Sequence, residues 1–98
     1  MRSVIIPAKL WNKIDELKNY LIEELKLSEP AAEARIQRME KFVMSFAVLV
    51  DYPLCRFKKW RELGYRCAVF ERSWIFAYEV FDGGVIVRDM SHAAILKD

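Results

Sequence analysis

The feature that most constrains the fold is a C-terminal stretch in which aromatic and branched apolar residues recur with a period of two. Three segments of the 98-residue chain carry this pattern, namely residues 65–70, 74–81 and 85–90. Such residues pack well on a pleated sheet, and the period is typical of strands. Asp82-Gly83-Gly84 separates the last two segments and is a strong hairpin signal. The C-terminal third is therefore predicted to be an antiparallel sheet.

The register of the last hairpin has two solutions, which differ in the residues at the centre of the turn. Gly83-Gly84 at the centre pairs Glu79 with Arg88, an opposite-charge pair that contributes roughly 0.2–1 kcal/mol. Asp82-Gly83 at the centre sets Ala77 beside Arg88 instead. The first register is preferred because it gains the ion pair.

The preferred register divides this hairpin into two faces. One face is large and apolar, and the helices can cover it: Trp74, Phe76, Tyr78, Val80, Val85 and Val87. The other face is mixed and holds Ile75, Ala77, Glu79, Phe81, Ile86, Arg88, Met90 and His92. Because a sheet needs only one covered face, the mixed face is predicted to be free for a functional site.

The N-terminal half reads as one short strand followed by two helices. Residues 3–6 form a β-branched run that Pro7 closes. Apolar residues then fall three or four positions apart, as in an amphipathic helix: Leu10, Ile14, Leu17, Leu21 and Leu25. Ser28 can cap a second helix over residues 29–50, whose first turn tolerates Pro30. A helical hairpin is therefore predicted before the sheet.

The second half of the second helix, residues 42–50, is apolar nearly all round. A helix end of this kind is buried on more than one side. Either it is wedged between the sheet and the first helix, or it leaves an apolar patch for a partner chain. Phe42, Phe46 and Leu49 are the candidate partner-binding residues of that patch.

Length and hydropathy favour a single cytoplasmic domain over residues 1–98. A membrane-spanning helix needs about 20 apolar residues, whereas the longest run without a charged residue, 42–50, has nine. The N-terminus is too short in apolar residues for a signal peptide. We therefore expect no membrane association.

Two cysteines and one histidine give little support to a metal site. Cys55 and Cys67 are twelve positions apart without CxxC spacing, and His92 is distant from both. Because the cytoplasm keeps thiols reduced, the cysteines are expected to be small apolar packing residues. We expect no metal and no cofactor.

Positive charge is concentrated in residues 56–72. Six basic side chains face only two acidic ones there, and the basic ones are Arg56, Lys58, Lys59, Arg61, Arg66 and Arg72. Interleaved aromatic residues such as Phe57 and Tyr65 can stack on bases, so the window is a candidate for binding nucleic acid or another target. The alternative is an ordinary solvated loop and strand.

A strand, a helical hairpin and an antiparallel sheet, in this order, resemble the RelE/ParE toxins of type II toxin–antitoxin systems, which include plasmid-stabilisation proteins. The resemblance covers essentially the whole chain and is carried by Gly64-Tyr65-Arg66, by Tyr78-Glu79-Val80-Phe81-Asp82 and by Val85-Ile86-Val87. It implies an α+β fold and a toxin that a cognate antitoxin, acidic and partly disordered, holds inactive.

The resemblance leaves the mode of action open. Some members of the family resemble nucleases that cut mRNA on the ribosome, with basic residues on the exposed sheet face to stabilise the phosphate. Others resemble inhibitors of DNA gyrase. Arg66 matches one basic position of the nucleases, but Ala68 and Ile75 stand where they carry cations.

The candidate catalytic residues are therefore Arg66, Arg88 and His92, with Arg72 able to substitute from nearby. Three functions remain open: ribosome-linked cleavage of mRNA, non-catalytic binding of a target such as gyrase, and a member without toxicity that only binds its partner. Whether the chain is an enzyme is not settled by its sequence.

Overall fold

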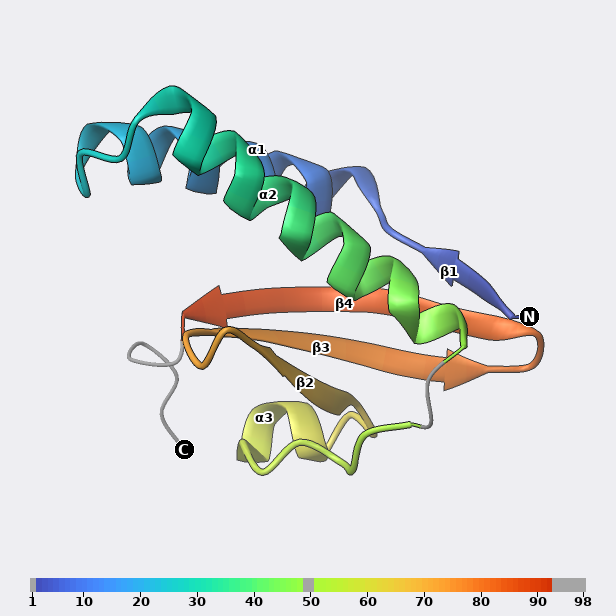
Figure 1. The fold of residues 1–98 in the computed structure, drawn as a ribbon. Coiled ribbons are helices and arrows are strands. Elements are labelled where there is room, and N and C mark those ends of the chain that lie inside the picture. The colour runs from blue at the N-terminus through green and yellow to red at the C-terminus, as the bar shows by residue number, and fades with distance from the viewer. Residues whose placement is uncertain (1, 49–50, 93–98) are drawn as a thin grey trace.

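The structure, a computed structural model, describes residues 2–48 and 51–92 and confirms the predicted α+β layout (Figure 1). Its elements are β1 (Ser3–Ile5), α1 (Ala8–Glu23), α2 (Glu29–Met44), the 3₁₀ turn η1 (Ser45–Ala47), α3 (Lys58–Arg61), β2 (Arg66–Phe70), β3 (Trp74–Phe81) and β4 (Gly84–His92). Only the four-residue α3 has no counterpart in the sequence prediction. None of the helices in the described part of the chain is long and apolar enough to cross a membrane.

The four strands form one sheet in the order β1-β4-β3-β2, in which β1 runs parallel to β4 and the other neighbours are antiparallel. Figure 1 shows α1 and α2 together on one face of this sheet and α3 on the opposite face. The sheet is therefore covered on both sides, by two long helices on one and by a loop with one helical turn on the other.

The predicted helical hairpin forms, but its second helix is shorter than predicted: α2 ends at Met44 and the 3₁₀ turn η1 follows it. The stripe of α1 is buried against the sheet, and Leu10 and Leu21 are almost fully enclosed. At the start of α2, the Ser28 hydroxyl accepts a hydrogen bond from the Ala31 N–H at 3.2 Å, which satisfies one of the unpaired donors of the first turn. The Ser28 cap thus marks where α2 begins.

Phe42 near the end of α2 and Phe46 in η1 pack against the core, whereas Met44 between them is 51% exposed. Phe46 is 1% exposed and stacks on Tyr78, with ring centroids 4.7 Å apart. Phe42 packs against Phe70 and Phe76 at centroid distances of 5.3 and 6.1 Å. These contacts support the wedged alternative for Phe42 and Phe46, and Leu49 lies outside the described residues.

The preferred hairpin register was wrong, because Asp82-Gly83 occupies the turn. Phe81 pairs with Gly84, so Gly84 belongs to the strand. Its lack of a side chain has a reason: a Cβ there would lie 2.5 Å from the Ser3 carbonyl oxygen. Gly84 lets β1 approach β4, and this contact outweighs the gain of one surface ion pair.

A β-bulge in β4 still allows the expected ion pair between Glu79 and Arg88. Tyr78 pairs with Val87, but the preceding Ala77 pairs with Asp89, which leaves Arg88 as the extra residue. Its guanidinium still reaches the Glu79 carboxylate, at 3.0 Å from Nε and 2.7 Å from the second nitrogen. The predicted Glu79–Arg88 contact therefore exists within a register that was not preferred.

The same bulge moves the end of β4 to the opposite face. Met90 is buried in the core beneath the helices, and the His92 ring meets the edge of Trp74 at a centroid distance of 4.8 Å. Their assignment to the mixed face was wrong, since one extra residue reverses the side on which every later side chain lies.

The second face of the sheet is not free along its whole length. Trp60 from α3 is 2% exposed and, with Cys55, forms a small core cluster with Ile75 and Ala77. Cys67 pairs with Ala77, which sets it on this face, and it forms a disulfide with Cys55. The sequence predicted two free cysteines that only pack, whereas this structure joins them as a disulfide.

Candidate functional site

The three candidate catalytic residues do not line one groove. Arg66 pairs with Tyr78 on one side of β3, and His92 pairs with Trp74 on the other side, four residues further back. Strand geometry separates the two Cα atoms by roughly 16 Å. Arg88 reaches Glu79 on the opposite face of the sheet. No single phosphate can meet all three side chains.

The Arg66 side chain hydrogen-bonds the loop that follows η1 to the sheet. Its guanidinium donates to the Tyr52 carbonyl at 2.7 Å, and the Tyr52 N–H donates to the Tyr78 hydroxyl at 2.9 Å. Beside them, Arg2 forms a two-pronged ion pair with Asp51 at 2.5 and 3.2 Å. This network joins the N-terminus, the sheet and the loop, so the geometry gives Arg66 a structural role.

Two pKa shifts follow from this network. The hydrogen-bonded Arg2 guanidinium holds the pKa of the Asp51 carboxyl below its usual value. Burial raises the pKa of the Tyr78 hydroxyl above its usual value. At neutral pH Asp51 is therefore an anion, and it accepts a hydrogen bond from the neutral Tyr78 hydroxyl at 3.4 Å.

Arg88 is exposed, but its charge is compensated. Both of its hydrogen bonds go to the same carboxylate oxygen of Glu79. An incoming phosphate would have to displace Glu79 before Arg88 could bind it. The structure therefore shows Arg88 in the surface ion pair with Glu79 that the sequence predicted.

Four cations of the basic window do gather, on the loop that carries α3. We call residues 56–61 the basic segment; its exposed cations are Arg56, Lys58, Lys59 and Arg61. The buried Trp60 anchors the segment, and Lys59 lies 5.6 Å from the centre of its ring. The Arg61 guanidinium donates to the Arg56 carbonyl at 3.1 Å, which ties the two ends of the segment together.

Arg72 lies elsewhere, at the turn between β2 and β3. It and Glu71 both have positive φ, at 65° and 47°. The Glu71 carboxylate is held by Arg38 at 2.8 Å and by Arg35 at 3.7 Å, from α2. Arg72 is thus a strained turn residue at the far end of β2 from the basic segment.

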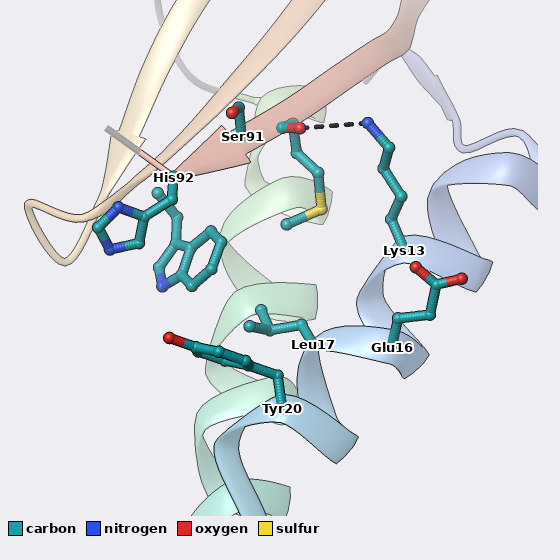
Figure 2. A pocket seen from close by; sticks show the side chains of 8 residues that line it. Lys13, Glu16, Leu17, Tyr20, Ser91 and His92 are labelled. Carbon is teal, nitrogen blue, oxygen red and sulfur yellow. Dashed lines mark hydrogen bonds between the residues drawn. The ribbon is translucent and has the colours of Figure 1, made fainter. Parts of the chain in front are cut away.

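A pocket opens where α1 passes over the ends of β3 and β4 (Figure 2). Its volume is about 580 Å³, and its lining residues are Lys13, Glu16, Leu17, Tyr20, Trp74, Met90, Ser91 and His92. Of these, sequence reasoning singled out only His92. The signal it missed is the spacing of Lys13, Glu16 and Tyr20, which share the flank of α1 beside Leu17.

The pocket does not bring a serine and a histidine together. Adjacent residues of a strand point to opposite faces, so the Ser91 hydroxyl and the His92 imidazole diverge, as Figure 2 shows. Lys13 forms an ion pair with Asp89 at 2.5 Å. Over residues 2–48 and 51–92, no three side chains gather that could hold a metal ion. The pocket is a candidate for binding.

A scan against models of known protein families found no match for this chain, and a search of curated proteins found none either. Its function must therefore be argued from the layout of the fold, the basic segment and the separation of the candidate catalytic residues.

Proposed function

We propose that this chain is the toxin of a type II toxin–antitoxin pair and that it acts by binding a macromolecular target without cutting RNA. The order of strand, helical hairpin and antiparallel sheet is the layout that the RelE/ParE resemblance implies. The observation that carries the choice of binding over cleavage is the separation of Arg66, Arg88 and His92.

The charges of the two arginines support the same choice. Electrostatic stabilisation of a phosphoryl transition state needs cations already aimed at one phosphate, and losing one such donor costs about 2.7–4 kcal/mol. Here Arg66 is directed to a backbone carbonyl and Arg88 to a carboxylate. Neither arginine could bind a phosphate without breaking its present contact, which for Arg66 is with the Tyr52 carbonyl and for Arg88 with the Glu79 carboxylate.

The basic segment is the surface that we assign to the target. Its four exposed cations lie on one short stretch anchored by Trp60, on the face of the sheet opposite α1 and α2. An acidic surface on a protein such as DNA gyrase would complement it and speed association. A cognate antitoxin would then inhibit the toxin by covering the same cations with acidic residues.

The proposal places the chain in the cytoplasm, where disulfides are rare. Cys55 and Cys67 would then be reduced in the cell, and the loop would rely on its hydrogen bonds and on Trp60. Target binding should therefore be compared for the oxidised and the reduced protein.

The test is expression under a tightly repressed promoter, with growth, transcript ends at the ribosomal A site and DNA supercoiling followed together. We expect growth arrest and altered supercoiling without new transcript ends. The double variant Arg56→Glu/Lys59→Glu should relieve the arrest, whereas Lys9→Glu, an exposed change on α1, should not. Transcripts cut at the A site would replace this proposal by mRNA cleavage.

Two further outcomes are informative. If the intact chain has no effect on growth, it is a member that has kept the fold and lost toxicity. A pull-down with the acidic protein encoded beside it then reports whether partner binding alone survives. If the charge-reversed variant arrests growth as strongly as the parent, the basic segment is not the target surface.

A further inference from the structure

The pocket under α1 lies on the side of the sheet that the helices cover, whereas the basic segment lies on the other side. Nothing in the proposed function uses it. Its volume of about 580 Å³ falls within the range of roughly 300–1,000 Å³ that small-molecule sites occupy. The pocket is therefore large enough to be a binding site separate from the basic segment.

Three aromatic rings form the walls of this pocket. Tyr20 projects from α1 and His92 from the end of β4 (Figure 2). Trp74, the first residue of β3, pairs with His92 and supplies the third ring. The T-shaped contact between Trp74 and His92, with ring planes at 88°, turns the two rings at right angles to each other. Leu17 and Met90, both buried, complete the floor. Aromatic faces attract cations and also pack against apolar groups.

The charges at the rim are unequal. The Lys13 ammonium is neutralised by Asp89 at 2.5 Å and also contacts the Met90 carbonyl at 3.4 Å. Glu16 is exposed one turn further along α1, and within the described part of the chain its carboxylate forms no ion pair. Because Asp89 compensates the charge of Lys13, the Glu16 carboxylate is the charge at the rim that remains without an ion pair among the described residues, which disfavours an anionic ligand and favours a cationic one.

From these features we propose that the pocket binds a small organic cation with an apolar body, such as an aromatic amine. The ring or chain of the ligand lies on Leu17, Met90 and Trp74. Its ammonium group meets the Glu16 carboxylate at the rim.

The test uses three ligands that share one ring and differ in charge: tryptamine, tryptophol and indole-3-acetate. Each is titrated into the full chain labelled with ¹⁵N, and affinities come from chemical-shift changes and calorimetry. Tryptamine should shift amides of α1 and of the end of β4, with an affinity about tenfold above that of neutral tryptophol. Indole-3-acetate should bind most weakly of the three.

Two variants separate charge from shape. Glu16→Gln should reduce tryptamine affinity about fivefold and leave tryptophol unchanged, because only the cation loses its partner. Asp15→Asn removes an exposed carboxylate from a neighbouring position of α1 and should change neither. An amide spectrum that matches the parent outside the pocket shows that each variant is folded.

The proposal fails if tryptamine causes no shifts at millimolar concentration, if the shifts fall outside the pocket, or if all three ligands bind equally. It also fails if Glu16→Gln and Asp15→Asn have the same effect. The growth assay is independent of it, since Glu16 lies away from the basic segment: amine binding can be lost while growth arrest persists, and the reverse.

Discussion

The two faces of the sheet are covered in different ways, and the difference decides what each can do. On one face, α1 and α2 bury a continuous core of aliphatic and aromatic side chains. On the other, a loop with the single turn of α3 contributes Trp60 and Cys55, and Cys55 is disulfide-bonded to Cys67 of β2. The two helices bury their face almost completely, so the pocket opens only at the edge of α1. The loop with α3 covers less of its face and carries exposed cations on its outer surface.

This comparison predicts that a single truncation costs most on the helix face. Phe46→Ala should lower the free energy of unfolding by about 3–5 kcal/mol, because it opens a cavity beside Tyr78 that the packed helices cannot close. Chemical denaturation measures the change. Met44→Ala, at an exposed position two residues earlier at the end of α2, is the matched control and should stay within about 0.5 kcal/mol. If Phe46→Ala lowers the free energy of unfolding only slightly, the helices must be able to move and close the cavity.

The disulfide should come next, and its effect should be confined to the loop face. Cys55 and Cys67 are twelve positions apart, and a loop of this size is worth about 3 kcal/mol in the chain-entropy account. The double variant Cys55→Ser/Cys67→Ser should lose about that amount. Hydrogen exchange should rise over residues 51–67 and stay unchanged in α1. Faster exchange throughout the chain would show that the two covers unfold as one unit.

A change in the β2–β3 turn supplies a baseline, because the turn belongs to neither cover. Arg72 sits at φ 65°, which costs a residue with a side chain about 1–2 kcal/mol relative to its preferred conformations. Arg72→Gly should therefore raise the stability by about 1 kcal/mol or slightly less, since glycine also gains entropy in the unfolded chain. Arg72→Ala, which keeps the Cβ, should bring no such gain. A loss on Arg72→Gly would show that its side chain makes a contact that matters.

The smallest effect is a pH dependence at the point where the chain passes from one face to the other. The folded-state pKa of Asp51 is lowered by its hydrogen bond to Arg2, so the stability it adds is fully present above the unfolded value of about 3.9. This stability is lost as the pH falls through the folded value. Asp51→Asn should consequently flatten the loss of stability below about pH 4, measured by denaturation at a series of pH values. An unchanged acid slope would contradict the assigned ion pair.

Local signals in the sequence determined the elements themselves. The spacing of Leu10, Ile14, Leu17 and Leu21 gives α1, Ser28 sets the start of α2, and Trp74–Phe81 forms over the residues that alternation indicates. Each of these depends on neighbours within a few positions, so a single chain can be read for them.

The tertiary structure decided the register, the faces and the sites. Two hairpin registers differ by less than 1 kcal/mol of side-chain pairing, and the close approach of Ser3 to Gly84 selects between them. The bulge at Arg88 then moves Met90 and His92 beneath the helices and beside Trp74. No local pattern contains the register, because the strand that selects it is more than 70 positions away along the chain.

The candidate site shows the same division. Composition located the basic segment, since clustered charge is visible in any sequence. It could not separate Arg66 and Arg72 from that segment, nor bring Tyr20 of α1 to Trp74 and His92. The sequence by itself determined which elements form and where positive charge accumulates. Only the packing of distant elements decided which side chains meet, because those contacts depend on how the strands align and how the chain crosses from one face to the other.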